Sequence, residues 1–312
     1  QVIDSSFEHN GDGILEGIKD DYNKWTIKGH SNRILHINKE KLELFAKIYD
    51  ESGTSYLEAR LPALHAVELI SVLEKFAIYP KKLADIKSEY YSTEMWHETN
   101  AQSDGTIERN TTFVESPEKL ILSGPHFFVG NPLYKSPQKV CDTNRSWDNI
   151  DLTTIPDSYL SRTNYTPLTS DYEKRIPTVD FGEGSKKVTD YYRMVHRSML
   201  SQAGERTFIC SLVLKGFGNI NTAMTTPFKD SKSLINFITT GISIPVDFFV
   251  KSTGKPKADG SMLQLLPLVE NIKALNRMLS LNCLSTYYTE LWEEQFDEEF
   301  KNDSWSRPND PR

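Results

Sequence analysis

Apolar positions recur at helical spacing in the first quarter of the chain, which predicts a helical N-terminal part. Asn38 is a favourable N-cap residue, and Leu42, Phe45 and Ile48 follow it on one helical face. A second helix is expected over residues 63–77, with a proline before its start and another after its end. We therefore expect helices to dominate up to about residue 88.

The pattern changes to β-type alternation in the middle of the chain. Residues 89–96 are aromatic and β-prone, and residues 106–114 alternate after a polar turn at 102–105. These two segments predict a hairpin. Residues 191–197 are expected to be regular, as helix or strand, and residues 208–214 are expected to form a buried strand.

Helical spacing returns in the last quarter of the chain. A strand is expected over residues 262–269, and helices are expected from Ser231 and over 270–282 and 285–300. Helices and strands thus occur in separate blocks, which predicts an α+β fold. The three expected parts are a helical connector at 1–88, a β-rich part with long loops at 89–230, and C-terminal helices with a polar tail at 231–312.

The charge of the chain is unevenly distributed. The formal net charge is -7, which taken alone argues against a nucleic-acid partner. Residues 109–215 nevertheless hold 14 Lys and Arg against 12 Asp and Glu, whereas the rest of the chain holds 22 against 31. Much of the acid lies in residues 290–303. The middle of the chain therefore remains open as a DNA-facing surface.

Cysteine usage and the ends of the chain indicate a cytoplasmic fragment. Cys141, Cys210 and Cys283 have no metal-ligand spacing, and their odd number argues against a disulfide framework. No apolar run approaches the roughly 18–20 residues of a membrane span. The first residues lack the features of a signal peptide. Because the chain does not begin with Met, we expect it to be part of a longer protein.

The stretch from Leu122 to Pro137 contains the most suggestive single motif. Asn131-Pro132-Leu133-Tyr134 differs by one residue from Asn-Pro-Pro-Tyr, the active-site loop of enzymes that methylate exocyclic amino groups. That chemistry also needs S-adenosylmethionine, bound at a glycine-rich turn in a doubly wound sheet. No such unit precedes residue 131, and Gly216-Phe217-Gly218 lacks a third glycine. We therefore expect a structural turn here, after a short strand at 126–129, and no cofactor site in this chain.

Two other groups suggest enzymatic chemistry. His97 and Glu98 would need a second histidine at position 101 for a zinc-protease motif, and Ala101 stands there. Asp180, Glu183 and Lys186 resemble a metal-nuclease core, with one residue too many between the last two. Both groups are more typical of strand ends and solvated loops. A metal-dependent nuclease remains an alternative hypothesis.

Basic, amide and hydroxyl side chains are spread through the middle of the chain, around an irregular, proline-punctuated stretch at 139–187. Arg recognises guanine bidentately, Asn recognises adenine, and hydroxyls and lysines hold phosphates. Each residue alone is typical of an ordinary surface position, but the set is typical of a recognition surface. The candidate DNA-binding residues are Arg109, Lys135, Arg145, Arg162, Asn164, Arg193, Arg197, Arg206 and Thr207.

The order and spacing of several short blocks carry a family resemblance. The blocks are Glu58 to Pro62, Glu94 to Asn100, Ser123 to Phe127 with Asn131 to Lys135, Tyr192-Arg193 with Arg197, Glu205-Arg206-Thr207, Leu234 to Ile238, Leu265 to Leu268 and Tyr287 to Trp292. Over roughly residues 30–295 the chain thereby resembles the target-recognition region of adenine-N6 DNA methyltransferases. The matching class is the type IIG restriction–modification enzymes and their phage-defence relatives.

The resemblance implies a C-terminal DNA-specificity fragment of a larger prokaryotic enzyme. The methylase domain, with its S-adenosylmethionine site and Asn-Pro-Pro-Tyr loop, would precede this region, so no catalytic residue is assigned to this chain. The fragment alone is not expected to be an enzyme. The implied partners are double-stranded DNA and the methylase domain in cis, with no membrane. A protein–protein interaction module that uses the acidic C-terminal helices is a further alternative.

Overall fold

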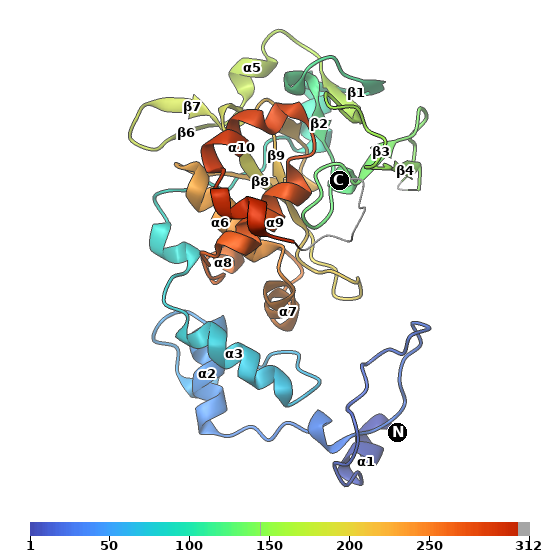
Figure 1. Ribbon diagram of the computed structural model, residues 1–312, viewed down its shortest axis with the longest axis vertical. Helices are drawn as coiled ribbons and strands as arrows, with labels where there is room; N and C mark the ends of the chain where they lie inside the picture. The colour runs from blue at the N-terminus through green and yellow to red at the C-terminus, as the bar shows by residue number, and fades with distance from the viewer. Residues whose placement is uncertain (144, 305–312) are drawn as a thin grey trace. The chain divides into compact units, whose positions relative to one another are not determined.

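The computed structural model describes residues 1–143 and 145–304, and most of the predicted polar tail lies outside this part. The chain divides into two compact units, Gln1–Pro80 with Phe248–Gly254, and Lys81–Asp247 with Lys255–Arg312 (Figure 1). Helices account for 35% and strands for 18% of the structure, and the strands form several small sheets, which confirms the predicted α+β fold. The predicted division into parts at residues 88 and 230 stays a prediction.

The first unit is helical. Its elements are α1 (Val2–Phe7), η1 (Ser31–Arg33), α2 (Lys39–Tyr49), η2 (Tyr56–Glu58), α3 (Glu68–Ile78) and the later part of α7 (Ile244–Ser252), where η denotes a 3-10 helix. The Asn38 side chain accepts the Lys41 N–H, which confirms the helix predicted after Asn38. α3 begins at Glu68 rather than at residue 63, because the Ala63 and Val67 N–H groups bond to distant carbonyl oxygens instead.

Aromatic packing forms the core of the first unit. The Phe249 ring stacks on Tyr49 and Phe76, with centroid distances of 5.4 and 4.7 Å. The Tyr49 hydroxyl lies 2.6 Å from the Ser252 hydroxyl. These contacts join α2 and α3 to residues about two hundred positions later in the chain, so local sequence patterns cannot reveal them.

The second unit contains every strand of the described chain. The strands are β1 (Ile107–Phe113), β2 (Ile121–Leu122), β3 (Lys135–Pro137), β4 (Trp147–Asn149), β5 (Arg162–Pro167), β6 (Thr178–Asp180), β7 (Ser185–Lys187), β8 (Arg193–Arg197), β9 (Cys210–Val213), β10 (Gly218–Asn219) and β11 (Ala223–Pro227). The helices are η3 (Leu83–Ile86), α4 (Glu98–Ser103), η4 (Pro117–Lys119), η5 (Gly124–His126), α5 (Tyr172–Arg175), η6 (Val188–Asp190), α6 (Ser231–Gly241), α8 (Gly260–Leu263), α9 (Ile272–Asn282), η7 (Thr286–Tyr288), α10 (Thr289–Gln295) and η8 (Glu298–Asn302).

An antiparallel sheet in the order β11-β8-β9 forms the centre of the second unit. Every residue of β9 is buried, which confirms the strand predicted over 208–214, and β8 occupies the regular segment predicted over 191–197. α6 packs against β8 and β9, and α9 packs on α6, as Figure 1 shows in orange and red. The Asp230 side chain caps α6 by accepting the Ser233 N–H at 2.8 Å.

Long-range pairing overturns the predicted hairpin. Residues 98–103 form α4 between its two segments, and residues 89–96 bond to β11 instead, with reciprocal bonds of 2.9 Å between Thr93 and Thr225. β1 pairs with β5, and an irregularity interrupts the register between Arg109 and Thr112. The predicted hairpin is therefore wrong, because each segment found a better partner far along the chain.

Two further strand predictions are wrong for a related reason. Residues 262–269 form the end of α8 and an irregular segment, since the Asp259 side chain accepts the Met262 N–H and starts a helix. Apolar runs buried on all sides do not distinguish strand from helix. His126 ends the 3-10 turn η5, and in the residues after it, 127–129, only Phe128 forms an isolated bridge. The helix predicted over 270–282 is confirmed as α9, whereas 285–300 is broken into η7, α10 and the start of η8.

Within residues 1–143 and 145–304, no single helix is long and apolar enough to cross a membrane. Together, α6 and α7 have the length and composition of a membrane span, but only as a pair with a sharp bend between the two helices. Most of α6 is buried against protein, as is usual for a core helix.

Candidate nucleic-acid interface

The structure brings five of the nine candidate residues together on one side of the second unit, around the two-stranded β1–β5 ribbon. Arg109 lies on β1, Arg162 and Asn164 lie on β5, Lys135 lies on β3, and Arg145 lies between β3 and β4. Figure 1 shows β1, β3 and β4 at one side of this unit and the β6–β7 hairpin at the other. We call β1, β5, β3, β4 and the residues between β3 and β4 the ribbon module.

Polar contacts tie the residues after β3 to the ribbon. The Arg109 guanidinium donates to the Cys141 carbonyl oxygen at 2.5 Å. The Asn164 amide donates to the Cys141 sulfur at 3.4 Å and accepts from the Thr111 hydroxyl at 3.3 Å. Asn164 is thereby buried and fully engaged, so it supports the module from within. Arg109 is exposed, although its charge is anchored at one carbonyl group.

Arg162 connects the ribbon to β3 and to the protein interior. Its guanidinium donates to the Pro137 carbonyl oxygen at 2.8 Å and lies over the Phe113 ring, 4.5 Å from the centroid. Its own carbonyl oxygen lies 3.0 Å from Nε2 of His126. Next along β5, the Thr163 hydroxyl donates to the Ile121 carbonyl oxygen on β2 at 2.7 Å. β5 is therefore fixed on both sides.

His126 is a buried, neutral residue that packs beneath the ribbon module. Its Nδ1 accepts the Ser123 N–H at 2.8 Å, so Nε2 carries the proton donated to Arg162. Its ring packs edge-on against the Trp147 ring, with 4.7 Å between the two ring centroids. Burial lowers the pKa of His126 to about 4. The same cause lowers the pKa of His196, buried beneath Phe208, to about 4.

Acid should weaken the fold through these histidines. The unfolded chain binds a proton at His126 below about pH 6.5, whereas the folded chain does so only near pH 4. Between these values each buried histidine lowers the free energy of unfolding by about 1.4 kcal/mol per pH unit as the pH falls. Replacing His126→Gln should reduce the slope of the unfolding free energy against pH by about that amount, as measured by urea unfolding at several pH values.

The unchanged protein and the His126→Gln variant contain the same carboxylates. The difference between their slopes of unfolding free energy against pH therefore reports on His126. The His97→Gln variant, which replaces an exposed histidine in the same way, is the matched control. An unchanged slope in the His126→Gln variant would contradict the neutral, buried assignment.

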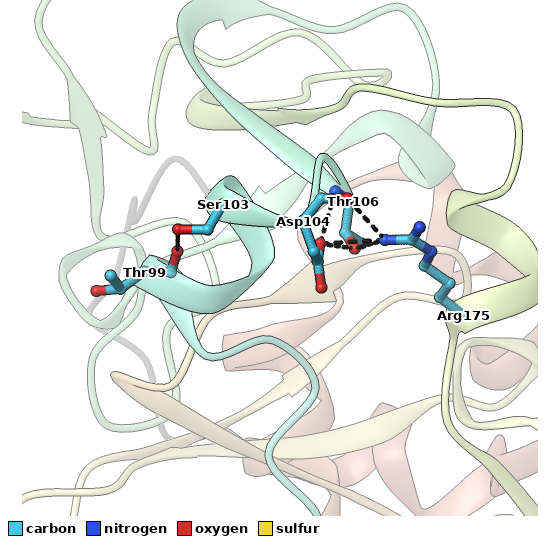
Figure 2. A network of polar contacts seen from close by, with 5 residues as sticks. All are labelled: Thr99, Ser103, Asp104, Thr106 and Arg175. Atoms are coloured by element: carbon cyan, nitrogen blue, oxygen red, sulfur yellow. Dashed lines mark hydrogen bonds and ion pairs between the residues drawn. The ribbon is translucent and has the colours of Figure 1, made fainter.

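A polar network fixes the start of β1 (Figure 2). One Asp104 carboxylate oxygen accepts from the Thr106 N–H at 3.0 Å, from its hydroxyl at 2.5 Å and from Arg175 at 3.1 Å. These Thr106 bonds, and then the Arg175 charge, lower the pKa of Asp104 below its usual value. In the preceding helical turn the Ser103 hydroxyl donates to the Thr99 carbonyl oxygen. The turn at Gly105, with φ +74°, then leads into the strand.

The outer surface of the ribbon module carries a small positive surplus. Residues 107–113, 135–149 and 162–167 hold five Lys and Arg (Arg109, Lys135, Lys139, Arg145, Arg162) and three Asp and Glu (Glu108, Asp142, Asp148). Lys139 and Arg145 are exposed, and the Lys135 ammonium lies over the Tyr134 ring at 5.0 Å from its centroid. Lys139 is not among the nine candidate residues predicted from the sequence. Its place between two selected residues could have identified it.

The other four candidates lie around the central sheet and brace it. Arg193 is only 1% exposed. Its guanidinium donates to the Thr225 hydroxyl at 2.9 Å and to the carbonyl oxygens of Val188, Tyr191 and Phe217. No carboxylate of the described residues forms an ion pair with it, and burial lowers its pKa to about 10. This residue holds β8, β11 and the segment before β10 together.

Arg197, Arg206 and Thr207 also bond inward. Arg197 donates to the carbonyl oxygens of Gly124 and Phe127, both at 2.9 Å, and thereby holds the Leu122–Pro137 stretch. Arg206 donates to the Ile242 carbonyl oxygen at 2.8 Å, and the Thr207 hydroxyl donates to the Ser201 carbonyl oxygen at 3.2 Å. These inward hydrogen bonds show that Arg197, Arg206 and Thr207 support the fold.

Asp247 is a buried residue that the sequence analysis missed. One carboxylate oxygen accepts the N–H groups of Thr207 and Phe208 at 2.8 and 2.7 Å, at the entrance to β9. The other lies 3.5 Å from Nε of Arg206. Asp247 stands in an apolar run, Ile244 to Val250, that carries no local indication of this pairing. The Glu205-Arg206-Thr207 block therefore has a structural partner.

The two sequence motifs that resemble methylase and nuclease sites, Asn131 to Tyr134 and Asp180 to Lys186, include turns. The Asn131 side chain accepts the Leu133 N–H at 3.0 Å, within a turn that begins at Gly130 with φ +63°. Asp180 accepts the N–H groups of Gly182 and Gly184 in the β6–β7 turn, and Lys186 pairs with Glu183. The described residues contain no group of three or more His, Cys, Asp or Glu that could hold a metal ion.

The chain was also compared with protein-family models and with curated proteins, and neither comparison finds a match.

Proposed function

We propose that this chain binds double-stranded DNA and acts as the specificity region of a larger adenine-N6 DNA methyltransferase of a restriction–modification or phage-defence system. One observation carries the proposal. Five candidate residues that are scattered over residues 109–164 lie together on the ribbon module, where Asn164 is buried and the other four, Arg109, Lys135, Arg145 and Arg162, carry positive charge. We include in this proposal that the chain belongs to the family it resembles and that it is located in the cytoplasm, where prokaryotic DNA is found.

The β1–β5 pair is a two-stranded ribbon, a form that can enter the major groove of B-DNA. The groove is about 12 Å wide and admits a two-stranded β-ribbon. Glu108, Asn110 and Thr166 lie on one face of the ribbon, where the Thr166 hydroxyl bridges the other two side chains at 3.4 Å each. In the proposed complex Asn110 reads a base edge, while Lys139 and Arg145 neutralise phosphates. Arg193, Arg197, Arg206, Asn164 and Thr207 support the fold and touch no DNA.

Salt dependence tests this assignment. A pool of random-sequence duplexes should bind the chain with an affinity that falls steeply with salt. The double variant Lys139→Glu, Arg145→Glu removes two proposed phosphate contacts. It should weaken binding and reduce the slope of log affinity against log salt by about 1.8. Fluorescence anisotropy at several salt concentrations measures both quantities.

A second double variant serves as the matched control. Lys229→Glu, Lys232→Glu makes the same change of charge at two exposed lysines beside the start of α6, outside the ribbon module. It should leave the slope unchanged apart from a small effect of net charge. Absence of duplex binding at low salt would overturn the proposal. Equal losses in both variants would remove the ribbon module as the binding surface.

A further inference from the structure

An exposed glutamate lies on the face of the ribbon module that is proposed to meet DNA. Successive residues of a strand point to opposite faces, so Glu108 and Asn110 share one face of β1. Arg109, on the other face, bonds to the residues after β3. Glu108 and Asn110 both remain exposed. A carboxylate repels phosphates, so its position on a DNA surface needs a chemical reason.

The Glu108 carboxylate is oriented by its neighbour across the ribbon. Glu108 and Thr166 are register partners on β1 and β5, and the Thr166 hydroxyl donates to Oε1 of Glu108 at 3.4 Å. The same hydroxyl accepts from the Asn110 amide at 3.4 Å. Within residues 1–143 and 145–304 Glu108 forms no ion pair, so its carboxylate keeps acceptor capacity for a ligand.

The edges of the base pairs limit the groups from which such a carboxylate can accept. In the major groove only the amino groups of cytosine and adenine donate, whereas guanine and thymine present acceptor oxygens. A carboxylate only accepts, so it is repelled by guanine and thymine. Adenine also places its N7 acceptor beside the amino group, and cytosine has no second acceptor there. Cytosine is therefore the base that fits Glu108.

We propose that Glu108 determines specificity by accepting a hydrogen bond from the N4 amino group of a cytosine in the major groove. Thr166 acts as a positioning residue, because its hydroxyl holds both Glu108 and Asn110. This inference rests on the proposed function, since it names one base of the DNA that the ribbon module binds.

The spacing of the strand places the second base reader relative to this cytosine. A strand rises about 3.3 Å per residue, and successive bases of one DNA strand lie about 3.4 Å apart. Asn110 follows Glu108 by two residues on β1. A strand that runs along the groove therefore brings Asn110 to a base pair about two steps from the cytosine.

Selection from a pool of random-sequence duplexes tests the inference. Sequencing of the duplexes that the unchanged chain retains should show a C·G pair enriched at one position. Glutamine carries an amide, which pairs bidentately with adenine, so Glu108→Gln should enrich A·T at that position. Two duplexes that differ only at this pair should differ roughly 5- to 150-fold in affinity for each protein, in opposite directions, as measured by fluorescence anisotropy.

Further variants separate base specificity from support of the fold. Thr166→Val keeps the branched shape and removes the hydroxyl, so it should weaken the preference for cytosine, whereas Thr166→Ser should keep it. The matched control is Glu293→Gln, which removes the same charge at an exposed position of α10, outside the ribbon module. It should retain the same C·G pair. The far-UV circular dichroism of each variant verifies that it is folded.

The outcomes distinguish this inference from the proposed function. Binding of the pool without an enriched C·G pair overturns the inference while the proposed function stands. A C·G pair that remains equally enriched by Glu108→Gln also overturns it. Absence of duplex binding at low salt overturns both.

Discussion

Replacing Arg193→Met should lower the free energy of unfolding by about 3 kcal/mol, because the acceptors that it now satisfies would be left without donors. Methionine fills much of the same volume, so the cavity is small and the lost hydrogen bonds dominate. The buried guanidinium bonds to Thr225 and to three carbonyl oxygens, and no described carboxylate pairs with it. Urea unfolding followed by tryptophan fluorescence measures the change.

The matched control for this variant is Arg175→Met. Arg175 is exposed and forms an ion pair with Asp104, and such pairs contribute about 0–1 kcal/mol. The folded Arg193→Met protein should bind the duplex pool as the unchanged chain does. Unchanged stability together with lost DNA binding would instead return Arg193 to the DNA surface.

Replacing Asp247→Ala should also cost about 3 kcal/mol of unfolding free energy. The change leaves two buried N–H groups, those of Thr207 and Phe208, without an acceptor and removes the anion beside Arg206. Asp247→Asn keeps an acceptor oxygen, so its loss should be smaller, about 1 kcal/mol. The same urea titration separates the roles of the hydrogen bonds and of the charge.

Asp230→Ala provides the scale for comparison. Asp230 caps α6 through a single N–H group of Ser233 at an exposed helix end, and removing such a cap costs about 1 kcal/mol. A loss in Asp247→Ala no larger than in Asp230→Ala would contradict the central place given to Asp247. In that case water would have to satisfy the two donors.

The predicted elements that are confirmed share a local cause. α2 follows Asn38 because the side chain of that residue satisfies a free N–H group of the first turn. β9 lies in an apolar run of strand length that only Ser211 interrupts, and each of its residues is buried. α9 buries one apolar face, which helical spacing reveals, and α6 begins at the Asp230 cap. In each case the deciding interactions lie within one turn or one strand.

The candidate site was predictable only as a set. Nine polar residues were selected because their side chains suit DNA, and the same side chains also suit backbone carbonyl groups inside a protein. Arg193 illustrates the ambiguity, since a guanidinium recognises a guanine edge and a cluster of carbonyl oxygens by the same donors. Burial distinguishes the two roles, and burial of one arginine depends on which strands meet around it.

The sequence alone establishes an α+β chain with a helical start and a buried central strand, because these properties follow from neighbours a few residues apart. Tertiary structure decided that β1 pairs with β5 rather than with residues 89–96, and that Asp247 lies under Thr207. It also decided that five candidates share the ribbon module while four brace the sheet. These outcomes depend on contacts between segments tens of residues apart, where many pairings compete and packing of the whole unit selects one.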